Sequence, residues 1–532
     1  MSNPPSSYNN LSQSARIEPE STTRAKQVNA IVNITLGLME KRLHKNGKVY
    51  LVNTNDRKVF FIDEDAIFNT VTRAAFYHDN NLVISNSAIQ AAKRILKDEH
   101  GATPSNIYLR VGFGAHHYWI DFADGVHFIA YSERGAFFGS RYEEAIRCID
   151  VDFFRPPETG SIPPLPVADR TRPPTAFGTE NRTNRADWLA RQYPHLEKIL
   201  SLTNIPENLY STVITWIICS LFPEENQFLL EIVGEEHSGK STTASIIKSL
   251  IDPSVITLEE APSSRKELLS LAQNRYIIAI DNADDLSNSM QQTIYELITK
   301  GISHRTNHGN SANDWTVNLR NPVISVSMSS MLTNRLLLKK SITINLPNLK
   351  SIRPDQSIIK DFADCQPQAL LELATIAANT LRKDNEETSI QESRLYIDNF
   401  ILMGFLVCES LGINKDEFIR NINDIKDEIT DNLLDESIVA KSLHLWAIKN
   451  PSANIERPIN YWHKELIKNL PEEERDQWPG SPRKFGSELK KIAAQIKKKG
   501  IICKSLGKQG SHHYWRIKTV ETLQSAKDID DF

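Results

Sequence analysis

The stretch GEEHSGKS, from Gly234 to Ser241, has the residue types and the spacing of a loop that binds nucleotide phosphates. Two glycines with four residues between them let the backbone turn tightly, so that several N–H groups can point at a β-phosphate. Lys240 would then reach the β- and γ-phosphate oxygens, and the Ser241 hydroxyl would bind Mg²⁺. We therefore predict that ATP and Mg²⁺ are bound here, by Gly234, Glu235, Glu236, His237, Ser238, Gly239, Lys240, Ser241 and Thr242.

The sequence on either side of this loop distinguishes a phosphate site from a chance glycine-rich turn. Apolar residues from Phe228 to Val233 predict a strand before the loop, and the run TTASIIKSLI after Ser241 predicts a helix. A preceding strand and a following helix are the context in which this motif binds phosphate, because the positive helix N-terminus then faces the anion. That context favours the phosphate site.

A second strand ends in an acidic residue. The continuous apolar run from Tyr276 to Ile280 predicts a strand buried on both faces, and Asp281 follows it. Asp281 would hold Mg²⁺ through water, although an aspartate here could instead cap the next helix. Many P-loop ATPases place glutamate next, to polarise the attacking water, whereas this chain has Asn282. Either Asn282 orients the water, or Asp284 or Asp285 supplies the carboxylate.

Length and composition limit the class of protein. A chain of 532 residues predicts three or four domains, and 40% hydrophobic with 24% charged residues is typical of a soluble globular protein. No apolar run is long enough to cross a membrane, and the first residues lack the basic and apolar regions of a signal peptide. The five cysteines include no CxxC pair, which predicts reduced thiols, no zinc site and a cytoplasmic protein.

The order of sequence patterns predicts a multidomain α/β protein. A helix is expected over residues 23–42, and the region with the sequence RPPETGSIPPLPVADRTRPPTAFG is expected to be an extended connector. The expected parts are a disordered lead and N-terminal helix (1–47), a mixed α/β domain (48–155), a proline-rich linker (156–185), a helical segment (186–225), a P-loop ATPase core (226–349), a helical domain (350–437), a winged-helix DNA-binding domain (438–520) and a tail (521–532).

The last domain carries a concentration of positive charge. The whole chain has a formal charge of −4, yet residues 483–518 contain eleven Lys or Arg residues against one acid. Two expected helices, a basic helix with Ser487 as its N-cap and two short strands follow the order of a winged helix. The alternative is a solvated basic helix without a ligand. The predicted DNA contacts are Lys490, Lys491, Lys497, Lys498, Lys504, Lys508 and Arg516.

Several short motifs occur in an order that resembles a known family. VGEEHSGKST, SRKELLSLAQNRYIIAIDNADDLSN, ELITKGISHRT, NPVISVSM and KKSITINLP follow one another as in the helicase-like P-loop ATPases of phages and mobile elements, near the poxvirus and phage primase-helicases and the superfamily 3 helicases. The resemblance covers about residues 106–385 and implies an AAA+-like core. Two motifs depart from the pattern, since a glycine-rich run is reduced to Lys300-Gly301 and the usual DRS is replaced by Lys339-Lys340-Ser341.

The resemblance implies a ring, in which a cation from the neighbouring subunit stabilises charge on the γ-phosphate. Arg305, Arg335 and Lys340 are the candidates, although a surface arginine is ordinarily just exposed to solvent. Ser327, with Ser325 as second choice, would sense the γ-phosphate. The loop that grips DNA in the pore would contain His304, Arg305 and His308, unless it is an ordinary surface hairpin.

Together these patterns predict an ATP-dependent DNA helicase or translocase that acts in the replication of a phage or mobile genetic element. It would act as a homo-hexamer on single- and double-stranded DNA. Priming would come from a separate primase or polymerase, because the first 150 residues lack a polymerase-type acidic cluster. The alternative is a DNA-binding ATPase, regulated by nucleotide, that serves recombination, regulation or defence without unwinding. A small-molecule kinase would need neither the basic domain nor a chain of this length.

Overall fold

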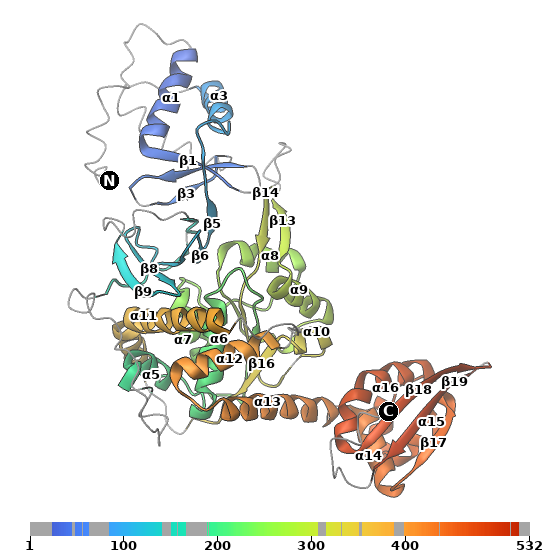
Figure 1. The fold of residues 1–532 in the computed structure, drawn as a ribbon. Coiled ribbons are helices and arrows are strands. Elements are labelled where there is room, and N and C mark those ends of the chain that lie inside the picture. The colour runs from blue at the N-terminus through green and yellow to red at the C-terminus, as the bar shows by residue number, and fades with distance from the viewer. Residues whose placement is uncertain are drawn as a thin grey trace. The chain divides into compact units, whose positions relative to one another are not determined.

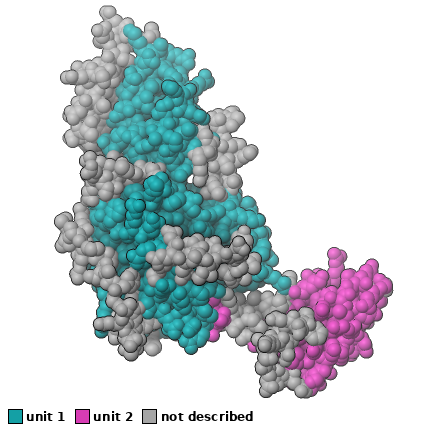
Figure 2. Space-filling model, in the orientation of Figure 1, with its two compact units in different colours: residues 1–421 teal, residues 422–532 magenta. Residues whose placement is uncertain are grey.

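The computed structural model describes residues 24–44, 48–55, 57–62, 85–140, 151–156, 158–165, 189, 191–306, 315–330, 332–349, 354–387, 398–435, 437–510 and 512–520. The expected disordered lead, most of the proline-rich linker and the tail lie outside these residues. The chain divides into two compact units, residues 1–421 and residues 422–532 (Figure 2). This division falls within the helical domain expected over 350–437. No helix in the described part is long and apolar enough to cross a membrane.

The first unit begins with two helices on a small sheet. α1 (Arg24–Leu38) and α3 (Asn86–Leu96) pack together, and the strand order beside them is β3-β2-β1-β4. The prediction of a helix over 23–42 is too long at its C-terminal end. The helix ends at Leu38, because Met39–Leu43 forms strand β1 and pairs with β2 (Figure 1). The strands are β1 (Met39–Leu43), β2 (Val49–Asn53), β3 (Val59–Phe60) and β4 (Thr103–Pro104).

A second sheet follows, so the described residues between 48 and 155 contain both helix and strand. Four strands form an antiparallel meander: β6 (Val111–Phe113), β7 (Tyr118–Asp121), β8 (His127–Ser132) and β9 (Gly135–Ser140). A separate parallel pair joins β5 (Asn106–Tyr108) to β10 (Val151–Phe153). The long helix α11 (Asp355–Glu387) packs against β8 and β9 and also against α5 (Pro194–Ser201).

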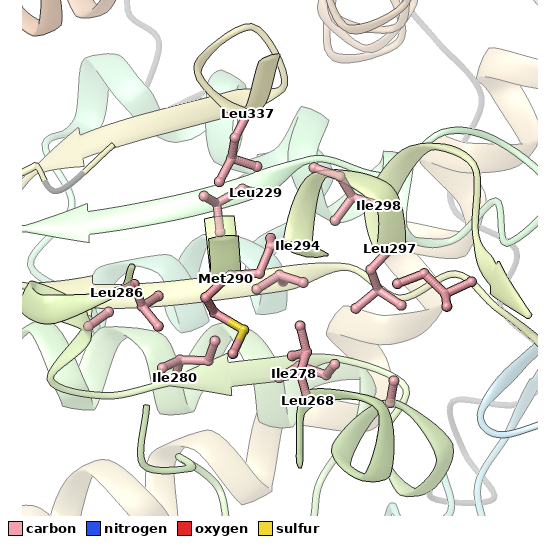
Figure 3. Packing of buried hydrophobic residues seen from close by; sticks show 14 of the residues in the cluster. Leu229, Leu268, Ile278, Ile280, Leu286, Met290, Ile294, Leu297, Ile298 and Leu337 are labelled. Atoms are coloured by element: carbon pink, nitrogen blue, oxygen red, sulfur yellow. The ribbon is translucent and has the colours of Figure 1, made fainter. Parts of the chain in front are cut away.

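The third sheet of this unit contains the predicted site. Its strand order is β12-β15-β11-β16, and each neighbouring pair is parallel. The strands are β11 (Leu229–Val233), β12 (Ile278–Ile280), β15 (Val323–Ser327) and β16 (Ser341–Asn345), and nearly every residue in them is buried. α8 (Arg265–Asn274) and α9 (Asn288–Thr299) cover one apolar cluster against this sheet, where Leu268, Ile278 and Ile294 meet (Figure 3).

The strand expected to begin at Tyr276 begins at Ile278, and a side chain explains the difference. The backbone N–H groups of Tyr276 and Ile277 donate to Asp252 Oδ2 at 2.9 and 3.0 Å. Asp252 directly follows α7 (Lys240–Ile251), the helix that the sequence predicts after the glycine-rich motif. The Asp252 carboxylate therefore accepts the backbone hydrogen bonds that a neighbouring strand would otherwise accept, so Tyr276 and Ile277 are not part of β12.

Asp252 also belongs to a group of buried charges. Its Oδ1 accepts from Arg110 Nε at 3.3 Å, and Arg110 is 0% exposed. The Arg110 guanidinium further donates to the carbonyls of Asp121 at 2.9 Å and Gly160 at 2.8 Å. Lys248 lies in the same group, and burial lowers the pKa of its ammonium to about 8. The charges are thus paired with one another or with backbone carbonyls, as buried charges require.

The first unit contains further helices and strands. They are α6 (Tyr210–Ser220), β13 (Ile302–Thr306), β14 (Trp315–Leu319), α10 (Arg335–Leu338) and α12 (Asp398–Leu411). α13 (Lys415–Asp435) begins in the first unit and ends in the second. β13 and β14 form a separate antiparallel hairpin.

The second unit has the element order helix, strand, helix, helix, strand, strand. These are α14 (Ile438–Lys449), β17 (Asn454–Pro458), α15 (Ile459–Leu466), α16 (Pro482–Ile496), β18 (Ile501–Gln509) and β19 (His512–Thr519). β19 lies between the other two strands, and Trp462, Phe485 and Trp515 belong to its buried core. The prediction that Ser487 caps the basic helix is wrong, because α16 begins at Pro482 and Lys484 N donates to Ser481 Oγ at 3.3 Å.

Candidate functional site

The glycine loop, residues 234–241, connects β11 to α7 and needs glycine at both ends. A Cβ added to Gly234 would lie 2.7 Å from Ser238 Oγ and 2.9 Å from the carbonyl oxygen of Leu346, closer than real contacts allow. Gly239 has φ +80°, a left-handed conformation that other residues adopt at a cost. The tight turn that the motif predicts is therefore present.

Lys240, Ser241 and Asp281 come together at this loop. Lys240 Nζ donates to the carbonyls of Gly234 at 2.8 Å and Glu235 at 2.6 Å. Ser241 Oγ lies 3.2 and 3.3 Å from the two carboxylate oxygens of Asp281. One hydroxyl and one carboxylate in contact provide oxygen ligands of the kind that Mg²⁺ prefers. The Ser241 hydroxyl and the Asp281 carboxylate therefore fit the predicted Mg²⁺.

The sheet explains why residues distant in sequence meet here. In a parallel sheet the carboxyl ends of all strands lie at one edge, where ligands of α/β proteins bind. The glycine loop follows β11, Asp281 follows β12, and Ser327 ends β15, the strand between them. Ser327 is buried, and its hydroxyl donates to the carbonyl of Ser329 at 2.8 Å. Ser325 lies deeper in the same strand, and its Oγ has no hydrogen-bond partner among the described residues.

Asn282, which replaces the expected glutamate, is exposed and has φ 50°. Its backbone N–H donates to Asp281 Oδ1 at 3.1 Å, so the chain turns sharply directly after the acidic residue. Asp284, one of the suggested substitutes, accepts a hydrogen bond from Met328 N at 2.8 Å. This bond ties the segment after β12 to the segment after β15.

Two of the three candidate cations, Arg335 and Lys340, have described side chains. Arg335 begins α10 and is exposed. Lys340 directly precedes β16, at the amino edge of the sheet opposite the glycine loop, and its carbonyl accepts from Leu229 N at 2.9 Å. Its ammonium is buried over the Phe228 ring, 5.0 Å from the centroid, and burial lowers its pKa. Within one chain, the buried Lys340 therefore lies away from the glycine loop.

The predicted pore-loop residues are only partly described. His304 and Arg305 belong to strand β13, and the described residues do not include their side-chain surroundings. His308 lies outside the described residues, in the segment that joins β13 to β14.

The predicted DNA contacts of the second unit occupy a helix and a hairpin. Lys490 on α16 and Lys504 and Lys508 on β18 are exposed, and Lys497 is half-buried. For Lys491 on α16 and Lys498 in the short helix that follows, only the backbone position is described. Arg516 lies on β19, and its Nε donates to Glu456 Oε1 at 2.7 Å. An ion pair therefore already engages Arg516.

Asn204 is a contact of the glycine loop that the sequence did not indicate. Its side-chain amide donates to the carbonyls of Ser238 at 2.9 Å and Pro347 at 2.5 Å. It thus joins the glycine loop to the segment after β16. The two partners lie 34 and 143 residues away, so no local pattern could reveal the role.

Neither a protein-family model nor a curated protein sequence matches the chain. Among solved structures, one described as "SCCmec type IV Cch - active helicase" aligns at 13% identity, with 91% of this chain and 94% of that chain covered and a TM-score of 0.42. The C-terminal region of NrS-1 in its apo A form aligns at 10% identity, with coverage of 92% and 98% and a TM-score of 0.36. Both likenesses are distant. Site residues are therefore assigned from the geometry of this chain alone.

Proposed function

We propose that this protein is an ATP-dependent DNA helicase or translocase. The observation that carries the proposal is the contact between Ser241 and Asp281 at the carboxyl edge of a parallel sheet, with Lys240 directly beside Ser241. Lys240 would bind the β- and γ-phosphates, and Ser241 and Asp281 would hold Mg²⁺, directly or through water. The metal would neutralise charge on the phosphates. Ser327, at the end of the central strand, is the proposed sensor of the γ-phosphate.

The second unit supports DNA as the partner. Its helix, strand, two helices and hairpin follow the order expected of a winged helix, which would place its third helix in a groove and its hairpin against the DNA backbone. Here the third helix, α16, and the hairpin strand β18 both present exposed lysines. A nucleotide hydrolase and a basic DNA-binding unit on one chain fit a protein that moves along DNA.

We further propose a homo-hexameric ring, in which the exposed Arg335 contacts the nucleotide of the neighbouring subunit. The hairpin of β13 and β14, with His304, Arg305 and His308, would face single-stranded DNA in the ring centre. Such a protein would serve replication of a phage or mobile genetic element and would need a primase or polymerase from elsewhere.

ATP turnover and strand separation test this proposal directly. The full chain is assayed with Mg²⁺ and ATP, with and without single-stranded DNA, and then on a forked duplex. We expect hydrolysis that single-stranded DNA stimulates and strand separation that requires ATP. Hydrolysis without separation on forks of either polarity would contradict the helicase assignment.

Asn282 favours one alternative, a nucleotide-regulated DNA-binding ATPase without unwinding activity. A protein that lacks the usual glutamate could bind ATP, hydrolyse it slowly and change its DNA affinity. In that case duplex affinity would differ between ATP and ADP, while forked DNA would remain paired at every ATP concentration.

The lysines of α16 give a prediction for DNA binding. Lys490 and Lys497 lie seven positions apart, on one side of the helical segment, while Leu489 and Ile496 are buried. Replacing both lysines with glutamate should weaken duplex binding and reduce the salt slope by about 0.9 for each phosphate that the helix no longer neutralises. Binding is measured by fluorescence anisotropy from low to high salt.

The control for that experiment is Lys441→Glu, on α14, compared with the single variant Lys490→Glu so that both change the net charge equally. Lys441 is also exposed, but it already pairs with Glu474 at 2.6 Å. This variant should keep the wild-type salt slope. Equal weakening in both variants would indicate a general charge effect rather than contact through α16.

A further inference from the structure

In the hydrolysis proposed above, a carboxylate that accepts the proton of the attacking water would speed the reaction, and position 282 does not provide one. Asn282 has an amide that can orient water but cannot take up a proton at neutral pH. The following inference rests on the proposed ATP hydrolysis and concerns the source of the missing carboxylate.

A short extended segment runs beside β12 on its outer side. Glu259 forms a parallel bridge with Ile280, in which Glu259 N donates to the carbonyl of Ala279 at 2.8 Å and Asp281 N donates to the carbonyl of Glu259 at 2.8 Å. Beyond this isolated bridge, the next residues of the two segments are Glu260 and Asp281. Because side chains alternate between faces along an extended segment, continuation of this register would direct Glu260 to the same face as Asp281, whose carboxylate contacts Ser241.

Two of the neighbouring acids are engaged in other contacts. Glu259 faces the opposite side and accepts from Arg275 Nε at 2.9 Å, and Asp284 accepts from Met328 N at 2.8 Å. Glu260 is exposed, and within the described part of the chain no hydrogen bond or ion pair engages its carboxylate. Its carboxylate is therefore available at the edge of the predicted site.

We infer that Glu260 is the general base for ATP hydrolysis, supplied from the segment next to β12 instead of from position 282. The water oxygen forms a bond to the γ-phosphorus, and the bond between that phosphorus and the β,γ-bridging oxygen breaks. ADP leaves with that electron pair, and the water proton passes to the Glu260 carboxylate. Asn282 holds the water by its amide, so the two positions share the work usually done by one glutamate.

The test compares turnover with nucleotide binding in Glu260→Gln, which keeps the size and removes the basic carboxylate. We expect turnover to fall by about 100-fold or more, the range typical when a general base is removed. The dissociation constant for Mg·ATP, measured by equilibrium dialysis on ice, should stay within about twofold. Glu207→Gln, at another exposed glutamate, is the control and should hydrolyse ATP at the wild-type rate.

A second-site change makes the test specific. Introducing Asn282→Glu into Glu260→Gln returns a carboxylate to the usual position and should restore at least a tenth of wild-type turnover. A merely structural role for Glu260 would not be rescued in this way. Wild-type turnover in Glu260→Gln, or loss of turnover only in Asp284→Asn or Asp285→Asn, would overturn the inference and leave the proposed function intact. Absence of turnover in the wild-type protein itself would overturn both.

Discussion

Replacing Lys240 with alanine should reduce ATP hydrolysis by about 100-fold or more. The ammonium is the one positive side-chain group of the glycine loop, and charge that develops on the γ-phosphate would lose its nearest protein cation. Folding should be unaffected, because Lys240 Nζ contacts only the carbonyls of Gly234 and Glu235 among the described residues. The measurement is steady-state phosphate release, together with the thermal unfolding midpoint.

Lys266→Ala is the matched control for this change. Lys266 is an exposed lysine on α8 of the same unit, and its removal alters the net charge equally. Turnover in this variant should match the wild type. If Lys240→Ala hydrolyses ATP at the wild-type rate, the glycine loop does not bind the reacting phosphates.

Replacing Arg110 with methionine should cost about 3–5 kcal/mol of the free energy of unfolding of the first unit. The guanidinium is 0% exposed and donates to Asp252 and to three backbone carbonyls, which would all be left without this donor. Methionine fills part of the space but offers no donor, so the Asp252 carboxylate loses the guanidinium that donates to its Oδ1. Urea unfolding of the full chain, followed by near-UV circular dichroism, measures the effect on the transition of this unit.

Arg265→Met provides the comparison. Arg265 also forms an ion pair, with Glu296 at 2.9 Å, but both side chains are substantially exposed. Exposed pairs contribute about 1 kcal/mol or less. Equal destabilisation by the two substitutions would mean that burial of the Arg110 pair does not determine its contribution.

Local patterns in the sequence identified the parts of the site that depend on neighbouring residues. The spacing from Gly234 to Ser241 predicted a loop between a strand and a helix, and both elements are present as β11 and α7. The apolar run before Asp281 predicted β12, although two residues too long. The missing information was the position of Asp252, whose carboxylate occupies the backbone groups of Tyr276 and Ile277.

Residues whose role depends on distant contacts could not be found in this way. Arg110 and Asp252 are 142 residues apart, and no local pattern indicates that the two side chains meet. Lys340 was chosen from its place in a resembling motif, and the sequence did not show that its side chain is buried over Phe228, at the edge of the sheet opposite the glycine loop. At α16, Pro482 at the first turn was the better start signal, and Ser487 was misread because serine also occurs within helices.

The carboxylate of Asp252 has a consequence for how this chain can vary in evolution. Asp252 directly follows α7, and its carboxylate binds the backbone N–H groups of Tyr276 and Ile277, 24 and 25 residues further on. The segment between them is therefore a loop whose two ends are held together. Closing a loop costs entropy that grows only with the logarithm of its length. Insertions or deletions in the turns of this loop would therefore cost little free energy of unfolding. The helix that begins with Lys240 and the strand that leads to Asp281 would keep their positions relative to each other.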